Sequence, residues 1–377
     1  MNDHIALVEP NYYTKFPPLG LLKLSTLEKR KGNTTELVRK GKFPKKKPSK
    51  IYITSLFTWA WEPVWQSVRK YKSWYPDIEI TLGGLYASLL PDHAKASGAD
   101  TVHIGLHLEA EHCIPDYSLV PEWDGNIIFA SRGCNNRCPN CVVPRVEGNI
   151  CLEKESIKHL LHPTHKKLIF FDNNILAMKY RDNIFEEIIE LNMPVDFNQG
   201  LDARLLDNKA ADYIGKMKIP MVRLAYDLPN QRDALKNAIE KLGENGITKR
   251  HILVYAMFNF IETPNDFLDR VKEILNWGAS CYPMRFQPIN TLKKDAYVST
   301  HWTNTQLNMV AQARRVMGYG GAFPPYNALI NKFEEADGFD KAFELYPIKK
   351  TKDDSVPLLK LETFFIEKDE SKPICMK

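Results

Sequence analysis

Short apolar runs alternate with segments of helical spacing along the first 120 residues. The apolar runs predict buried strands, and the segments between them predict helices with one apolar side. The expected strands lie at residues 4–9, 35–38, 51–55, 78–82 and 101–104, and the expected helices at 21–30, 61–74 and 91–96. This alternation favours a Rossmann-like parallel sheet with helices on its faces, and such sheets bind ligands at the carboxyl ends of their strands.

The same alternation continues beyond residue 120, where polar residues follow each apolar run. Strands are expected at residues 127–130, 168–171, 195–198, 221–225, 252–256 and 284–287, and helices at 184–191, 210–217, 234–242 and 267–277. Six such units predict a partial (β/α)6 TIM-type barrel, whose chemistry takes place at the carboxyl ends of the strands. Helices at 303–317 and 333–345 predict a small, mostly helical C-terminal region. We therefore expect an α/β protein with a Rossmann-like domain at 1–120, the partial barrel at 121–290 and the C-terminal region at 291–377.

One predicted crossover of the first sheet lacks a helix. Between the strands at 35–38 and 51–55, residues 39–50 include seven basic residues and two prolines, so this segment must be an exposed loop. Two interpretations stay open. The loop from Lys40 to Lys50 binds an anionic macromolecule such as a nucleic acid, or it is a solvated loop that keeps the sheet edge soluble.

Composition narrows the class of protein. With 44% hydrophobic and 26% charged residues, the chain is of ordinary globular composition, which excludes wholesale disorder, collagen-like repeats and coiled coil. No apolar run approaches the roughly 18 to 20 residues of a membrane span, and the N-terminus lacks the apolar segment of a secretory signal. Seven cysteines, three of them within eight residues, fit a reducing cytoplasm better than a disulfide framework. We expect a cytoplasmic protein with no membrane partner, and its net charge of +5 permits an anionic one.

The strongest chemical signal is the spacing C-x3-C-x2-C at Cys134, Cys138 and Cys141, directly after the expected strand at 127–130. Three thiolates on one loop can hold three irons of a 4Fe–4S cube and leave the fourth iron open to a substrate or cosubstrate. A zinc site needs a fourth ligand, and Cys151 stands alone ten residues on, without a second C-x2-C pair. A disulfide within the cluster would leave one thiol over. The spacing therefore indicates an iron–sulfur site.

This cysteine loop resembles the signature of the radical S-adenosylmethionine (SAM) enzymes. The resemblance implies that Cys134, Cys138 and Cys141 ligate the cluster and that SAM chelates the open iron. It also implies an external one-electron reductant of the flavodoxin or ferredoxin type, which triggers cleavage of SAM to a 5′-deoxyadenosyl radical that abstracts hydrogen from a substrate. In the family, the residue before the third cysteine is usually aromatic and lies near the adenine. Asn140 takes that position here, so the loop backbone or an apolar wall elsewhere is expected to meet the adenine.

Three short motifs near the N-terminus resemble the cobalamin-binding-type domain that precedes many radical SAM enzymes. They are Pro-Pro-Leu-Gly-Leu-Leu at 17–22, Ser-Leu-Phe-Thr-Trp at 55–59 and Gly-Gly-Leu-Tyr-Ala-Ser at 83–88. The resemblance implies the class B methyltransferase-like branch, with cobalamin as a candidate cofactor. The Asp-x-His-x-x-Gly motif, whose histidine ligates cobalt in some cobalamin proteins, is absent, as it is in many relatives.

Polar residues that follow the barrel strands are the candidates for binding SAM. The resemblance places the contact to the SAM amino group after the second barrel strand, where Asp172 and Asn174 stand in the sequence Asp-Asn-Asn. Arg223 and Asp227 flank the fourth strand and are candidates for the methionine carboxylate and the ribose hydroxyls, because the planar fork of arginine binds a carboxylate at two points. For each residue the alternative is a cap, a turn or a salt bridge at a strand end. The remaining candidates, which follow the third strand, are Gln199 and Arg204.

Three functions are compatible with these patterns. The first is cobalamin-dependent methylation of an unactivated carbon by a radical SAM enzyme, which the N-terminal motifs favour slightly. The second is a cobalamin-independent radical SAM modification or rearrangement of a nucleic acid or other macromolecule, which the missing crossover helix and the basic loop favour. The third is a nucleic-acid-binding module with a structural cluster, which the open cysteine site and the barrel pattern disfavour.

Overall fold

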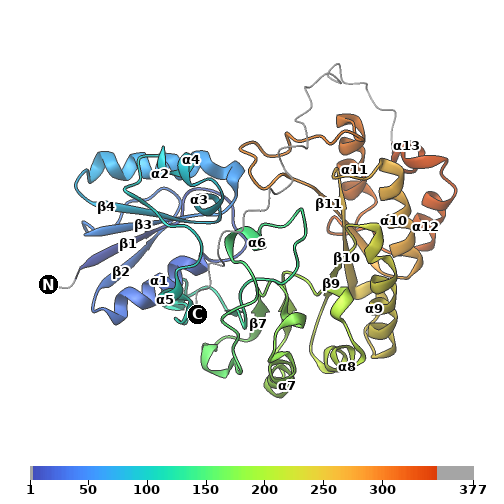
Figure 1. The fold of residues 1–377 in the computed structure, drawn as a ribbon, viewed down its shortest axis with the longest axis horizontal. Helices are drawn as coiled ribbons and strands as arrows, with labels where there is room; N and C mark the ends of the chain where they lie inside the picture. Colours follow the sequence, from blue (N-terminus) through green and yellow to red (C-terminus); the bar gives the residue numbers. More distant parts are fainter. Residues whose placement is uncertain (1–2, 346–377) are drawn as a thin grey trace.

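The computed structural model describes residues 3–345, so the end of the expected C-terminal region lies outside the described residues. The described part is a mixed α/β protein with parallel sheets (Figure 1). Its strands are β1 (His4–Val8), β2 (Thr34–Val38), β3 (Lys50–Ser55), β4 (Glu79–Gly84), β5 (Thr101–Val102), β6 (Gly125–Ile128), β7 (Lys167–Phe170), β8 (Val195–Phe197), β9 (Val222–Ala225), β10 (Ile252–Phe258) and β11 (Ser280–Arg285). Its α-helices are α1 (Leu19–Arg30), α2 (Trp61–Trp74), α3 (Leu85–Leu89), α4 (Pro91–Lys95), α5 (Leu108–Glu111), α6 (Val143–Val146), α7 (Arg181–Leu191), α8 (Asn208–Lys216), α9 (Arg232–Glu244), α10 (Pro264–Asn276), α11 (Asn304–Val316), α12 (Asn327–Glu334) and α13 (Gly338–Phe343).

The first five strands form one parallel sheet in the order β2-β1-β3-β4-β5. The order reverses between β1 and β3, which is where doubly wound sheets bind ligands. Helix α2 packs its apolar side, with Val64, Val68 and Tyr71, on this sheet. The crossover from β2 to β3 contains no helix, as the run of lysines and prolines predicts. Strand β2 is therefore left as an edge of the sheet.

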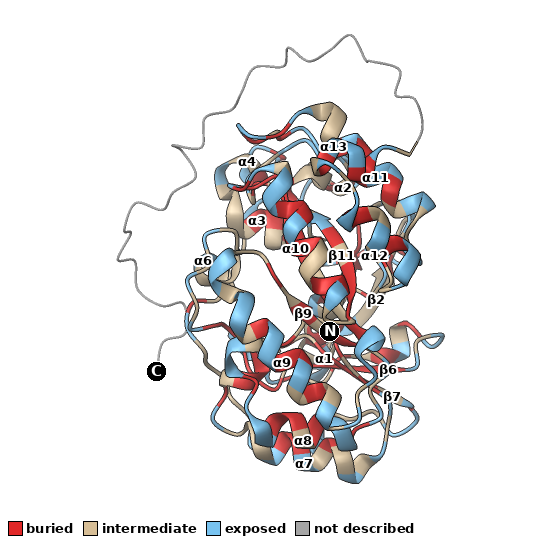
Figure 2. Cartoon of the chain, turned by 90° about the vertical axis from the view of Figure 1, so that its right-hand side faces the viewer, coloured by how far each residue is buried: buried red, intermediate tan, exposed pale blue. Residues whose placement is uncertain are grey.

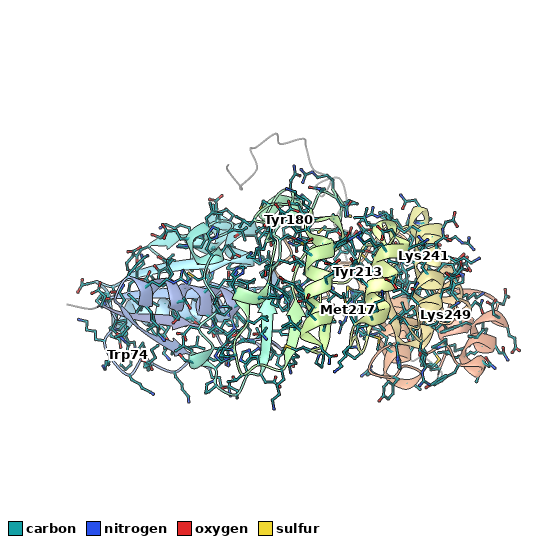
Figure 3. All side chains as sticks on the ribbon, turned by 90° about the horizontal axis from the view of Figure 1, so that it is seen from below. Trp74, Tyr180, Tyr213, Met217, Lys241 and Lys249 are labelled. Atoms are coloured by element: carbon teal, nitrogen blue, oxygen red, sulfur yellow. The ribbon has the colours of Figure 1, made fainter. Side chains whose placement is uncertain are left out.

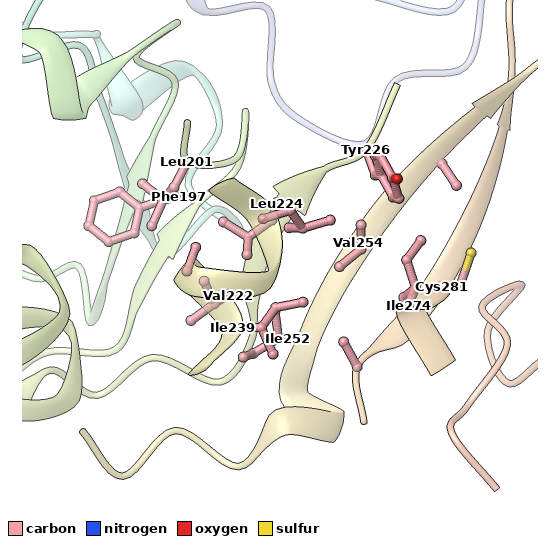
Figure 4. Packing of buried hydrophobic residues seen from close by; sticks show 14 of the residues in the cluster. Phe197, Leu201, Val222, Leu224, Tyr226, Ile239, Ile252, Val254, Ile274 and Cys281 are labelled. Atoms are coloured by element: carbon pink, nitrogen blue, oxygen red, sulfur yellow. The ribbon is translucent and has the colours of Figure 1, made fainter. Parts of the chain in front are cut away.

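The next six strands are parallel and form two sheets, in the orders β6-β7-β8 and β9-β10-β11. Between β8 and β9 the backbone N–H of Leu201 donates to the carbonyl of Arg223 at 2.8 Å, which joins the two sheets. Helices α7 to α10 alternate with these strands along the chain. The apolar side chains between strands and helices form one continuous core (Figures 2 and 4). The six strands that the sequence predicts for this part of the chain are present and parallel.

Helices α7 and α8 lie side by side on the outside of this core (Figure 3). The hydroxyl of Tyr213 on α8 donates to Glu186 on α7 at 2.6 Å. The ammonium of Lys241 on α9 donates to the carbonyl of Leu206 at 3.2 Å, just before α8. These polar contacts hold neighbouring outer helices in fixed positions relative to one another.

Several elements differ from the expected ones. Strand β11 begins at Ser280, four residues before the predicted start, because Pro283 is tolerated in this strand, which pairs with β10 along its length and with Phe323 at Cys281. The helix expected at 333–345 is divided into α12 and α13, and the amide of Phe339 at the start of α13 is bound by the side chain of Asn265 at 2.8 Å. Helices α3, α5 and α6 were not expected. No helix of the described residues is both long and apolar enough to cross a membrane.

Candidate functional site

The carboxyl ends of the N-terminal sheet and of the barrel strands meet at one interface. Phe16, which follows β1, packs edge-on against Phe171 after β7, with ring centroids 4.9 Å apart. The indole N–H of Trp61 at the start of α2 donates to the carbonyl of Leu292, in the segment that follows β11, at 3.1 Å. Helix α3, directly after β4, packs on α6 (Figure 1). Because α6 directly follows the cysteine loop, the carboxyl ends of the N-terminal sheet and of the barrel strands lie next to that loop.

The cysteine loop leaves β6 and is closed on itself. Gly133 has a φ of +76°, and a Cβ there would overlap the carbonyl oxygen of Asn149. The amide of Cys134 donates to the carbonyl of Gly148 at 3.0 Å, and Arg132 pairs with Cys151 in an isolated antiparallel bridge. The first cysteine is thereby held against the end of the same loop.

The side chain of Glu147 also holds the cysteine loop in place. Its carboxylate accepts from the guanidinium of Arg132 at 2.8 Å, from the amide of Gly133 at 2.9 Å and from the side chain of Asn173 at 2.8 Å. One side chain therefore ties the start of the loop, its end and the segment after β7 together.

The three thiols share one site and each has a hydrogen-bond donor. The amide of Asn136 donates to Sγ of Cys134 and the amide of Val143 to Sγ of Cys141, both at 3.4 Å, while the Arg204 side chain hydrogen-bonds Cys138. Burial raises the pKa of Cys138 and raises that of Cys141 to about 11, and the neighbouring sulfurs add to both increases. N–H donors oppose the cost of burial because they stabilise thiolates.

Within residues 3–345, no three His, Cys, Asp or Glu side chains are arranged to hold a single metal ion. A cube does not need that convergence, because each of the three thiolates binds a different iron. The donor chemistry of the loop, three cysteines with N–H groups directed at their sulfurs, suits an iron–sulfur cluster. The oxygen ligands that magnesium or calcium require do not gather there.

Asp202, after β8, connects the thiols with two of the predicted residues. Its carboxylate accepts from Arg204 at 2.8 Å to each oxygen, from the amide side chain of Asn136 at 2.9 Å and from that of Asn174 at 3.2 Å. Burial alone would raise the pKa of Asp202, but hydrogen bonds from Arg204 and Asn136 hold it below its usual value. Asn174 and Arg204 are thus brought to Cys134 and Cys138 by one carboxylate.

Asn174 carries an unsatisfied oxygen beside the cysteines. Its side-chain N–H group lies 3.8 Å from Sγ of Cys134, and the residue is only 4% exposed. Among the described residues its Oδ1 atom has no hydrogen-bond partner. A buried carbonyl oxygen without a donor costs free energy, so this atom marks a place where a bound group with an N–H or O–H would be stabilised.

Asp172 is fully engaged with the backbone that leads into the cysteine loop. Its carboxylate accepts from the amides of Ala130 and Ser131, at 3.0 and 2.6 Å, and from the hydroxyl of Ser131 at 2.8 Å. These bonds replace ladder bonds to β7, which explains why β6 ends at Ile128, before the predicted end. Burial raises the pKa of Asp172 to about 6.

Asn140 and Asp227 lie together on the β9 and β10 side. The Asn140 side chain hydrogen-bonds Asp227 and also lies 3.6 Å from the sulfur of Met257. Burial raises the pKa of Asp227, against the attraction of Arg270. The residue before the third cysteine and the end of β9 therefore offer a combined polar and apolar surface.

The last two predicted residues are not part of these clusters. Arg223 is ion-paired with Asp196 of the neighbouring strand β8, and Gln199 is exposed after β8. Sequence reasoning did not select Asp202, Glu147 or Asn136. Asp202 could have been found as the N-cap of the turn at Ala203–Leu205. Its side chain accepts a hydrogen bond from the backbone amide of Arg204. Nothing in the sequence marks Glu147.

No protein-family model and no curated protein matches this chain. Among solved structures, it is similar to the radical S-adenosylmethionine methyltransferase TsrM from Kitasatospora setae, solved with its tryptophan substrate and the SAM analogue aza-SAM. The superposition covers 84% of this chain and 77% of TsrM, at 13% sequence identity and a TM-score of 0.58. The arabinose-binding protein AraP from Geobacillus stearothermophilus, also 13% identical, reaches a TM-score of only 0.21. The chain therefore has a TsrM-like fold with parallel sheets.

Proposed function

We propose that this protein is a radical SAM enzyme whose 4Fe–4S cluster is held by Cys134, Cys138 and Cys141. The observation that carries the proposal is the set of three thiols, each with a hydrogen-bond donor, at the carboxyl ends of the barrel strands. Cysteine thiolates hold such clusters, and hydrogen bonds to sulfur tune their potentials. When bound and reduced by a flavodoxin- or ferredoxin-type partner, cluster and SAM supply a 5′-deoxyadenosyl radical.

The residues around the thiols are suited to hold the polar groups of SAM. The unsatisfied oxygen of Asn174 accepts a hydrogen bond from the SAM amino group, next to Cys134. Arg204, oriented by Asp202, offers a cation for the methionine carboxylate. Asp227 and Asn140 offer a carboxylate and an amide to the ribose. Asp172 orients the loop rather than the cosubstrate, since its bonds are made to the backbone of Ala130 and Ser131.

We further propose that the N-terminal sheet binds cobalamin and that the reaction is methylation of an unactivated carbon. When bound, cobalamin carries a methyl group between SAM and the substrate. One observation at the switch point supports a ligand there. The hydroxyl of Thr58 after β3 is buried and has no hydrogen-bond partner among residues 3–345.

The experiment that tests the radical SAM assignment is anaerobic reconstitution of the full chain with iron and sulfide. We expect one 4Fe–4S cluster per chain and, with a chemical reductant and SAM, formation of 5′-deoxyadenosine. Cys134→Ala should lose both. The matched control is Cys113→Ala, which removes a buried cysteine outside the loop and should retain both. A variant without Cys134 that still forms 5′-deoxyadenosine would overturn the assignment.

The cobalamin assignment is tested on the same protein. Hydroxocobalamin is added, the excess is removed, and corrin absorbance is compared with protein and iron content. Retention near one corrin per chain, with a deuterated methyl group passing from SAM to a bound acceptor, supports methyl transfer. An unretained corrin with continued SAM cleavage favours the second candidate, a cobalamin-independent radical SAM modification. Two observations favour this cobalamin-independent function: the short β2–β3 crossover and the absence of the Asp-x-His-x-x-Gly motif.

A further inference from the structure

A cleft of about 660 Å³ follows the free edge of β2 in the N-terminal sheet. Thr35 and Leu37 of the strand form its floor. Phe43, Lys45 and Lys46 of the β2–β3 loop form one wall, and Leu119, which precedes β6, also lines the cleft. The cleft is separate from the cysteine loop, because β2 and α6 lie apart in both views of the ribbon (Figures 1 and 2).

Within residues 3–345, the floor of the cleft presents backbone groups without a hydrogen-bond partner. The amide of Thr34 donates to the carbonyl of Asp3 at 2.8 Å, and the amide of Glu9 donates to the carbonyl of Val38 at 2.9 Å. Since alternate residues of a strand face the same neighbour, residues 34, 36 and 38 bond to β1. The N–H and C=O groups of Thr35 and Leu37 therefore point away from β1 and into the cleft.

The wall with the lysines is fixed in place. The ring of Phe43 lies 4.0 Å from that of Trp74, at the end of α2 far from the barrel (Figure 3), and the ammonium of Lys70 lies 3.8 Å from its centroid. The hydroxyl of Tyr71 donates to the carbonyl of Lys42 at 2.8 Å. The loop is thereby held beside β2, and the Phe43 ring is covered by its own neighbours.

The cleft carries three exposed cations, Lys42, Lys45 and Lys46, and within the described residues none of their ammonium groups is paired with a carboxylate. The Glu36 carboxylate also lines the cleft, where it accepts from the backbone amide of Lys45 at 2.8 Å and lies 3.5 Å from Nε2 of His4. Arg39, by contrast, is paired with the buried Glu9. Cations along a sheet edge repel a second copy of the same edge and attract an acidic chain.

We propose that this cleft binds an extended acidic segment of a peptide or protein, which adds a strand to β2. The unpaired groups of Thr35 and Leu37 give the main-chain bonds, the apolar sides of Leu37 and Leu119 receive alternate side chains, and the three lysines bind the acidic ones. A nucleic acid fits less well, because the one aromatic ring of the cleft is covered and offers no face for a base. The inference goes beyond the proposed function and does not depend on it, because binding needs no SAM or reductant.

The test is fluorescence anisotropy with the full chain and a labelled eight-residue peptide of alternating glutamate and valine. We expect binding of this probe, and no binding of the same peptide with lysine in place of glutamate. Replacing Lys42, Lys45 and Lys46 together by alanine should weaken binding about tenfold or more. Thr35→Pro should weaken it to a similar extent, because the N–H that proline removes faces the cleft and not β1.

Matched controls separate strand addition from charge attraction. Thr35→Val keeps the outward N–H while removing the hydroxyl that bonds Ser25, and should bind as the unmodified chain does. Should Thr35→Pro fail to fold, a probe N-methylated at alternate residues removes the same bonds from the peptide side. Its binding should also fall.

Three outcomes would overturn the proposal. The first is a labelled single-stranded oligonucleotide of equal charge that binds more tightly than the peptide and binds the Thr35→Pro variant as tightly as the unmodified chain. The second is a dimer in solution that Thr35→Pro dissociates, which would assign the edge to a second copy of the chain. The third is an acidic probe that does not bind. The lysines would then serve only to keep the exposed sheet edge from pairing with other chains.

Discussion

Two carboxylates after neighbouring barrel strands hold the cysteine loop by different means. Asp172 binds backbone amides where the loop begins, and Asp202 binds side chains that reach the sulfurs. Both sit where a carboxylate after a strand is ordinarily assigned to a ligand. Their contacts show that a strand-end acid can serve the site by fixing the chain around it.

The buried carboxyl group of Asp172 predicts that the free energy of unfolding depends on pH. Burial raises its pKa to about 6, above the 3.8 of an unburied aspartate, so the folded chain binds this proton more readily than the unfolded chain. The free energy of unfolding should therefore rise as the pH falls from about 6 towards 4, by up to roughly 3 kcal/mol from this group.

Asp172→Asn removes that titration. Urea unfolding of both proteins between about pH 4 and pH 7 should show the unmodified chain gaining stability over the variant on acidification. Asp172→Asn should also be less stable throughout, by about 1–3 kcal/mol, because an amide cannot accept from both Ala130 and Ser131. Parallel pH profiles of the two proteins would contradict the buried, proton-binding role.

At the scale of elements, the junction between β4 and α3 depends on one of two adjacent glycines. Gly84 has a φ of +102°, and a Cβ there would overlap the carbonyl oxygen of Ser55. A Cβ at Gly83 would meet only the Cβ of His103, at an ordinary 3.7 Å. The pair therefore provides a variant and its control in consecutive positions.

Gly84→Ala should destabilise the N-terminal sheet by about 2–4 kcal/mol, because it combines backbone strain with a steric overlap. Gly83→Ala should change stability by less than about 1 kcal/mol. Thermal or urea unfolding followed by circular dichroism gives both values. Equal effects of the two substitutions would show that the turn can relax around a side chain.

The elements that the sequence predicts well are those whose signal is local. The apolar runs gave most strands within two or three residues, and Thr303 caps α11 as a hydroxyl before a helix should, accepting from the amide of Gln306 at 3.2 Å. The early start of β11 and the division of α12 from α13 depend on partners far along the chain, Ala256 and Asn265. The cysteine loop was predictable from spacing, whereas Asp202 and Glu147 act through neighbours that only the folded barrel brings together.

At the scale of the whole molecule, the N-terminal sheet and the barrel strands are joined at their carboxyl ends by specific contacts. The hydrogen bond from Trp61 to the carbonyl of Leu292 spans 231 positions of sequence. The next two residues, Lys293 and Lys294, are exposed. Release of that bond should therefore be visible as easier cleavage of this segment by trypsin.

Trp61→Phe keeps an aromatic ring beside Trp65 but removes the N–H donor. Losing a net 1 kcal/mol or so from one hydrogen bond predicts about fivefold faster cleavage after Lys293 or Lys294 in limited proteolysis. Trp74→Phe, at the far end of α2, is the matched control and should leave the rate unchanged. A rate unaffected by Trp61→Phe would mean that other contacts hold the two halves together.

The position of the β2 edge, at the side of the molecule away from the cysteine loop, has a consequence for any chain that is both held and modified. Such a chain would be anchored at one point and react at another, so the stretch between the two acts as a tether. Tether length sets the local concentration of the reacting residue: too short a spacer forbids reaction, a matching one maximises it, and longer ones dilute it gradually. In a series of acidic peptides that differ only in spacer length, the rate of modification should then peak at the length that matches the distance from the β2 edge to the cysteine loop.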